Sequence, residues 1–125
     1  MLILTKYIAK KEYKPLNKHL NIDDLLDGAK RVIKGLAVET KPPRDIPNFR
    51  FFKVRIGKRN SVRMIVFLVT TNQKIVPVLI RLKKDKIFGM NMAMNNPYVV
   101  QQINKNLDRI LDDLKNNDYQ SFDLA

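Results

Sequence analysis

The chain has 125 residues, of which 45% are hydrophobic and 29% are charged, with no cysteine. This length suits one modest core, so we expect a single domain over residues 1–125. The absence of cysteine excludes disulfides, zinc–thiolate sites and cysteine nucleophiles. No stretch approaches the roughly 18 apolar residues of a membrane span, and no secretory signal pattern is present. We therefore expect a cytoplasmic protein with no membrane partner.

The positive charge is concentrated in one part of the chain. Lys and Arg number 24 against 12 Asp and Glu, which gives a formal charge of +12. Residues 91–125 hold three basic and five acidic side chains, so the first ninety residues carry the whole excess. Such a field attracts polyanions and speeds encounter with them. RNA or DNA is therefore the first candidate partner, and a solubilising charge or an acidic protein partner is the alternative.

The first half of the chain contains two predicted elements and a loop. Loose alternation over residues 2–13 predicts a strand that leads into a turn at Pro15. Asn21 is a good helix N-cap, two aspartates follow it, and apolar residues recur at helical spacing as far as Leu36. This pattern predicts an amphipathic helix of about four turns. Residues 40–47 hold three prolines and predict a loop.

Three β-rich runs, residues 50–56, 62–70 and 74–84, predict two consecutive hairpins. One face of this sheet is wholly apolar and is expected to form the core under the helix: Phe52, Val54, Ile56, Val62, Met64, Val66, Leu68, Val76, Val78, Ile80 and Leu82. The opposite face is apolar at one end and cationic at the other: Phe51, Lys53, Arg55, Arg63, Ile65, Phe67, Val69, Ile75, Pro77, Leu79, Arg81 and Lys83. Pro77 indicates an edge strand or a bulge, because proline cannot donate to the ladder.

A second amphipathic helix is predicted after Asn96 and Pro97, which suit the N-cap and first helical positions. Its apolar stripe runs from Val100 to Leu114. The fold class predicted is therefore α+β: a small antiparallel sheet with an N-terminal helix packed on one face and an additional C-terminal helix. Unless that last helix covers them, five residues of the cationic face would form an exposed apolar strip. These are Ile65, Phe67, Val69, Ile75 and Leu79.

Strand register brings three arginines together. A three-residue loop at 71–73 places Arg63 directly opposite Arg81, and a bulged loop in the first hairpin places Arg55 opposite Arg63. Like charges that face each other across strands are destabilising, so a sequence that keeps them commonly has an anion to offset the repulsion. A phosphodiester is such an anion. The alternative is that the three side chains fan out into water.

These hairpins resemble the RelE/ParE toxin superfamily in three segments: FKVRIG at 52–57, VRMIV at 62–66 and IVPVLIRLKK at 75–84. The likeness extends over residues 20–95. The resemblance implies a bacterial or archaeal toxin of a type II toxin–antitoxin pair. Most such toxins are ribosome-dependent mRNA endonucleases, and those of the ParE branch inhibit DNA gyrase. It therefore implies two partners, ribosome-bound mRNA and a cognate antitoxin with an acidic or amphipathic segment.

The resemblance places Arg55, Arg63, Arg81 and Lys53 in a catalytic role without metal or cofactor. Guanidinium groups bind phosphate bidentately, and a lysine crowded by other cations has its pKa lowered toward use as a base. Further cations are candidates for nucleic-acid binding: Arg50, Lys58, Arg59, Lys83, Lys84 and Lys86. Because the other side of its strand is apolar, loss of Arg81 is expected to leave the core intact.

The sequence departs from the family at one position. The tyrosine or histidine often found near the end of the last strand is missing from residues 87–90, and Tyr98 comes only at the start of the last helix. Lone His19 is predicted to be a surface residue. The leading hypothesis is an RNA-cleaving toxin. The alternatives are a non-catalytic ParE-like toxin and an RNA-binding or ribosome-binding module, although Phe51 and Phe67 alone offer aromatic rings amid the basic residues.

Overall fold

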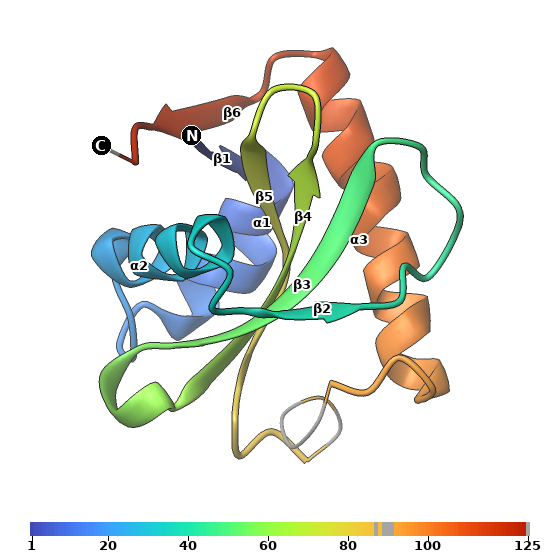
Figure 1. Ribbon diagram of the computed structural model, residues 1–125. Coiled ribbons are helices and arrows are strands. Elements are labelled where there is room, and N and C mark those ends of the chain that lie inside the picture. The colour runs from blue at the N-terminus through green and yellow to red at the C-terminus, as the bar shows by residue number, and fades with distance from the viewer. Residues whose placement is uncertain (87, 89–91, 125) are drawn as a thin grey trace.

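The computed structural model describes residues 1–86, 88 and 92–124, and its centre is a six-stranded sheet (Figure 1). The strand order is β2-β3-β4-β5-β1-β6, and every adjacent pair is antiparallel except β1 with β5. The strands are β1 (Leu2–Thr5), β2 (Val38–Thr40), β3 (Phe49–Ile56), β4 (Val62–Val69), β5 (Lys74–Leu82) and β6 (Tyr119–Phe122). This arrangement confirms the α+β class. The two short strands β2 and β6 were not predicted.

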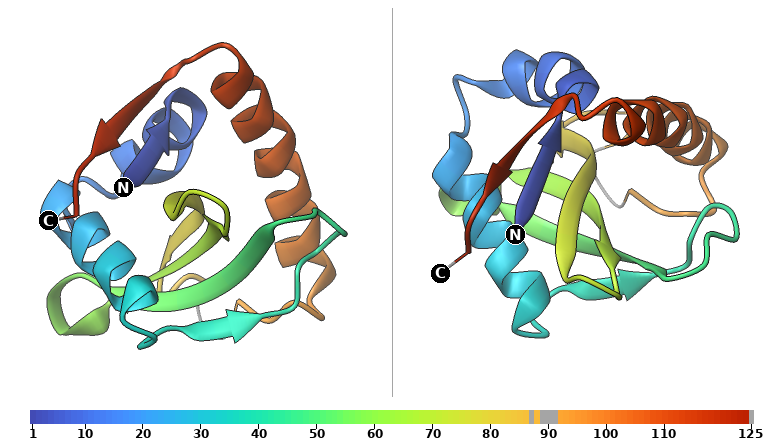
Figure 2. Two further views of the ribbon diagram at one scale, coloured as in Figure 1. Left: turned by 45° about the horizontal axis from the view of Figure 1, so that its top comes forward. Right: turned by 90° about the horizontal axis from the view of Figure 1, so that it is seen from above.

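Two long helices lie on opposite sides of the sheet, as Figure 2 shows from two directions. They are α2 (Ile22–Ile33) and α3 (Pro97–Lys115). The shorter helical pieces are α1 (Lys6–Ile8), the π-helical turn Ala9–Tyr13, and the 3-10 turns Lys14–Leu16 and Lys58–Asn60. The α+β fold therefore has its sheet between two amphipathic helices.

The predicted strand over residues 2–13 is wrong beyond Thr5, where the chain becomes helical. The end of α3 and the turn that follows it supply the acceptors for this helical start. The Tyr7 N–H donates to Asp113 Oδ2 at 2.7 Å, and the Lys6 N–H donates to the Asp118 carbonyl at 2.9 Å. Because the first amides of a helix have no partner within it, these distant acceptors stabilise the helix in place of a longer strand.

Both predicted helix caps are confirmed. Asn21 Oδ1 accepts from the Asp24 N–H at 3.1 Å, and Asp24 Oδ2 accepts from the Asn21 N–H at 2.9 Å, which completes a capping box. Asn96 Oδ1 accepts from the Tyr98 N–H at 3.0 Å at the start of α3. Helix α2 is shorter than predicted because it ends at Ile33, before Gly35 at φ +75°. Leu36 consequently lies outside the core, 70% exposed.

The predicted register of the arginines is confirmed. Arg55 lies opposite Arg63, and Arg63 lies opposite Arg81. The second hairpin closes one residue earlier than predicted, with Val69 opposite Lys74, and a register shift between Ile65 and Val66 compensates. This shift leaves Val78 without a partner in β4, so the bulge that Pro77 indicated is present. The buried Asn106 of α3 donates to the Val78 carbonyl at 2.7 Å and satisfies it.

The bulge exchanges the faces of the residues that precede it in β5. Ile75 lies opposite Leu68, and Val76 lies opposite Phe67, so the predicted faces of Ile75, Val76 and Pro77 are wrong. All three are nevertheless buried. Ile65, Phe67 and Leu79 keep the predicted face and are fully buried on the side where α3 packs. Helix α3 therefore covers Ile65, Phe67 and Leu79 of the predicted apolar strip.

Helix α2 packs closely on β3 because a glycine stands at the contact. A Cβ atom added at Gly28 would lie 2.7 Å from Ile56 Cγ2 and 2.8 Å from Met64 Cε. The predicted core residues are buried as expected, since Val54, Val66, Val78 and Ile80 are each at most 4% exposed. The absence of a side chain at position 28 therefore sets the distance between helix and sheet.

We predict that Gly28→Leu lowers the free energy of unfolding by about 1–3 kcal/mol, because the new side chain overpacks the contact with β3. The matched control is Asp27→Leu, an exposed neighbour in the same helix, which should change it by less than about 0.5 kcal/mol. Urea denaturation of both variants measures the difference. Equal stability of the two variants would contradict the packing described here.

Candidate nucleic-acid interface

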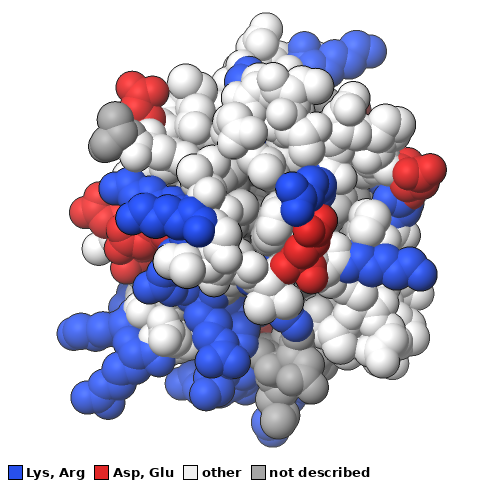
Figure 3. Space-filling model, in the orientation of Figure 1, with Lys and Arg blue, Asp and Glu red and all other residues white. Residues whose placement is uncertain are grey.

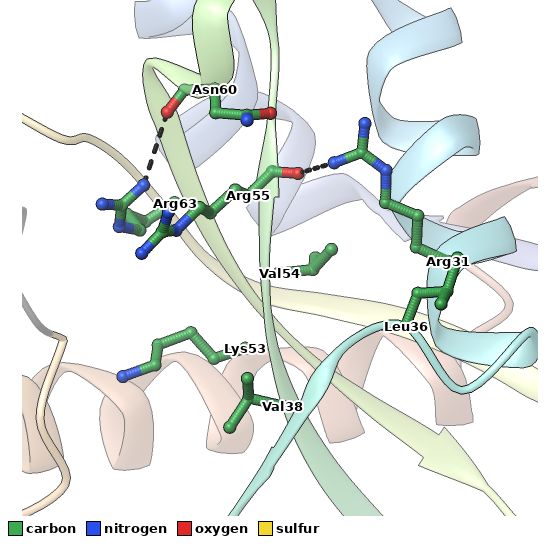
Figure 4. Close-up of a pocket in the computed structure, with 8 residues that line it drawn as sticks. All are labelled: Arg31, Leu36, Val38, Lys53, Val54, Arg55, Asn60 and Arg63. Atoms are coloured by element: carbon green, nitrogen blue, oxygen red, sulfur yellow. Dashed lines mark hydrogen bonds between the residues drawn. The ribbon is translucent and has the colours of Figure 1, made fainter.

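Three cationic side chains from β3 and β4 point to the same side of the sheet and line one pocket (Figure 4). They are Lys53 and Arg55 of β3 and Arg63 of β4. The pocket has a volume of about 310 Å³, and its remaining walls are Arg31, Leu36, Val38, Val54 and Asn60. The structure therefore brings together three of the four side chains predicted to be catalytic.

The pocket forms where the edge of β3 becomes unpaired. Strand β2 pairs with β3 only as far as Lys53, so the Arg55 carbonyl has no partner strand. The guanidinium of Arg31, which comes from α2, donates to this carbonyl and holds the edge (Figure 4). Sequence reasoning missed Arg31, because its position in an amphipathic helix gives no sign of a contact with the sheet.

Arg63 is buried and Lys53 is half-buried in the pocket, and the positive charge of the exposed Arg55 acts on both. Arg63 is only 6% exposed, and its one hydrogen bond among the described residues is a long one to the Asn60 carbonyl, at 3.4 Å. Burial lowers the pKa of Arg63, and the charge of Arg55 lowers it further. The pKa of Lys53 is lowered from 10.5 by burial first, then by Arg63 and Arg55. Within the described part of the chain, no ion pair joins Arg55 or Arg63 to a carboxylate.

Arg81 differs from the other arginines because its charge is neutralised. Its Nη2 donates to Glu12 Oε2 at 2.8 Å and its Nε to Glu12 Oε1 at 3.1 Å. Glu12 is 3% exposed and also accepts from the Ile80 N–H at 2.8 Å. The Phe88 ring lies on the guanidinium, 4.4 Å from its centre. The planar fork of Arg81 is therefore occupied by a buried carboxylate that sequence reasoning missed.

The remaining predicted cations lie in three different places. Arg50 forms a bidentate ion pair with Glu39, at 2.6 and 2.9 Å, which lowers the pKa of Glu39 and keeps Arg50 outside the pocket. Lys58 and Arg59 lie in the loop between β3 and β4, and three exposed lysines follow β5: Lys83, Lys84 and Lys86. In the space-filling view, Lys and Arg gather at the lower left, where this loop lies (Figure 3).

The position at which the family often has tyrosine or histidine is only partly visible, since residues 87, 89 and 90 lie outside the described residues. Phe88 is described and packs on Arg81. Among the described residues, no group of three or more His, Asp or Glu side chains is placed to hold a metal ion. No helix of the described chain is long and apolar enough to cross a membrane.

Comparison with protein-family models, with curated proteins and with solved structures gives no significant match. The resemblance to the RelE/ParE toxins therefore stays a prediction.

The ion pair with Glu12 changes the expected effect of removing Arg81. We predict that Arg81→Ala lowers the free energy of unfolding by about 2–4 kcal/mol, because it leaves a buried carboxylate unpaired. The double variant Glu12→Gln/Arg81→Met should recover most of this loss, since both charges are then absent. Urea denaturation at neutral pH measures both effects.

Arg50→Ala is the matched control, because it breaks an ion pair whose partners are about half exposed and should change stability far less than Arg81→Ala. If Arg81→Ala were as stable as Arg50→Ala, the Glu12 pair would have no structural importance.

We predict that Lys53→Met raises the melting temperature at neutral pH. The pKa of Lys53 is lowered in the folded protein, so its charged form is destabilising there at every pH below that lowered pKa. As pH rises through the lowered pKa toward 10.5, the lysine loses its proton and the advantage of methionine should shrink. Thermal melts at pH about 7 and about 10 test this sign. A variant less stable than the original protein at both pH values would refute it.

Proposed function

We propose that this protein binds RNA and cleaves it as a toxin-type endoribonuclease, with one phosphate held by Arg55 and Arg63 and with Lys53 beside it as the base. The observation that carries the proposal is that Arg55 and Arg63 lie opposite each other and line one pocket, and that neither forms an ion pair with a carboxylate among the described residues. Burial and mutual repulsion make this arrangement unfavourable without an anion. A bound phosphodiester would supply the missing charge.

Arg55 and Arg63 suit different roles in binding a phosphate. Arg63 is almost wholly buried and fixed by its strand, which suits a bidentate hold on the phosphate oxygens. Arg55 is exposed and can meet the incoming chain. Lys58 and Arg59 of the β3–β4 loop extend the positive surface beyond the pocket (Figure 3). Binding that uses several phosphate contacts weakens steeply as salt rises.

The lowered pKa of Lys53 supports a role as general base. A neutral Lys53 amine would take the proton of an RNA 2′-hydroxyl, and the 2′ oxygen would bond to the adjacent phosphorus. The bond from phosphorus to the 5′ oxygen breaks, leaving a 2′,3′-cyclic phosphate and a 5′-hydroxyl whose oxygen takes a proton from water. Arg55 and Arg63 would stabilise the charge that develops on the phosphate. By the resemblance, the substrate would be ribosome-bound mRNA in the cytoplasm and the inhibitor an acidic antitoxin.

One observation favours a second candidate, a toxin or module that binds without cleaving. Glu12 occupies the guanidinium of Arg81, so the third arginine of the ladder is not available to a phosphate unless that pair opens. A ParE-like inhibitor of gyrase or an RNA-binding or ribosome-binding module needs the cationic surface but no base. The two candidates differ in whether RNA is cut.

We predict that Arg55→Ala lowers RNA cleavage by about a hundredfold, the scale for loss of one fixed charge stabiliser, and reduces the salt slope of binding by about one. The matched control is Arg50→Ala, which removes a cation from the same strand but outside the pocket. Gel assays should follow free RNA, and primer extension should follow a message under translation. Thermal melts should accompany each variant.

If both variants lose cleavage equally, net charge and not the pocket would determine activity. If RNA binds with the predicted salt dependence but neither free nor translated RNA is cut, the non-catalytic candidate replaces the nuclease. An affinity that does not change between low and physiological salt would remove nucleic acid as the ligand.

A further inference from the structure

A second pocket lies beside the same β3–β4 loop and has a different chemistry. Its volume is about 440 Å³, and it is lined by His19, Arg59, Ser61, Leu82, Lys83 and Lys84. Three of these side chains are cationic, and the described lining includes neither Asp nor Glu. The pocket also contains an aliphatic side chain and two flat groups, the imidazole of His19 and the guanidinium of Arg59. It therefore combines positive charge with surfaces that suit an aromatic ring.

The two pockets lie on either side of one loop. Asn60 lines the first pocket and Ser61 lines the second, so adjacent residues separate them. The Lys83 N–H donates to the Ser61 carbonyl at 2.7 Å, which fixes the wall on the β5 side. The strands that contribute to the two pockets, β3 and β5, are two strand spacings apart, which is roughly 10 Å. A nucleotide next to the phosphate bound by Arg55 and Arg63 can reach this distance.

Arg59 stands in a backbone conformation that arginine seldom adopts. Its φ and ψ are 55° and 27°, in the left-handed region, where glycine or asparagine is favoured. The next residue, Asn60, has φ of 53°. Residues held in an unfavourable backbone conformation at the tip of a loop are typical of positions that serve binding rather than stability.

We infer that the second pocket receives an unpaired nucleobase of the RNA whose phosphate lies in the first pocket. Single-stranded RNA is recognised by stacking of its bases on aromatic rings or on guanidinium planes. His19 and Arg59 supply such groups, Leu82 supplies an apolar floor, and the two lysines attract the flanking phosphates. A site for phosphate alone would not need the apolar floor. This inference rests on the proposed function, because it requires an RNA chain in the first pocket.

The test compares a ligand with bases and a ligand without them. The probes are a fluorescein-labelled 2′-O-methyl oligouridylate of about ten residues, which cannot be cleaved through its 2′ oxygen, and an abasic backbone of the same length. In anisotropy titrations, His19→Ala and Arg59→Lys should each weaken binding of the oligouridylate about five- to tenfold and leave binding of the abasic backbone nearly unchanged. Arg59→Lys keeps the charge and removes the plane.

Lys18→Ala is the matched control, because it removes a cation beside His19 that does not line this pocket. This variant should weaken the binding of both probes by the same factor. If Arg55→Ala weakens binding but His19→Ala and Arg59→Lys do not distinguish the probes, the base pocket is refuted while the proposed function stands. If the unaltered protein binds neither probe, both proposals fail.

Discussion

The arrangement of the sheet depends on the ion pair between the buried carboxylate of Glu12 and Arg81. Three arginines stand side by side on β3, β4 and β5, which is an unfavourable alignment of like charges. Glu12 neutralises Arg81 and also holds the backbone of β5 through Ile80. The repulsion is thereby confined to β3 and β4. The result is a sheet with one neutralised arginine in its interior and, at its edge, a pocket in which Arg55 and Arg63 have no ion-pair partner among the described residues.

Local pattern predicted the central hairpins and both long helices well. Asn21 and Asn96 cap the helices because capping needs only residues close in sequence. The opposition of Arg55, Arg63 and Arg81 also followed from turn length and alternation. The predicted pairing of Arg63 with Arg81 was correct although the loop between β4 and β5 was misplaced by one residue, because the bulge at Val78 compensates for that residue. The face of Ile75 was wrong for the same reason.

The features missed by sequence reasoning all depend on contacts between distant segments. Glu12 stands in a basic run that locally resembles a strand, and only the fold carries it to Arg81. Arg31 reaches the Arg55 carbonyl because β2 stops at Lys53, and β2 itself is too short to leave a pattern. The cations of the candidate site were therefore predictable from the alternation of side chains along the strands. The carboxylate that neutralises Arg81 and the open edge of β3 could be recognised only in the tertiary structure.

The position of β1 affects how this chain folds. It lies between β5 and β6, and its residues Leu2 to Thr5 pair with Tyr119 to Phe122 (Figure 1). The strand made first during synthesis must therefore wait for the segment made last among those in the sheet. Loops of this length close slowly, and proteins with such distant pairings fold more slowly than those with local contacts. During that wait the outer edge of β1 has no partner strand, and an open strand edge is a site at which other chains can pair and aggregate.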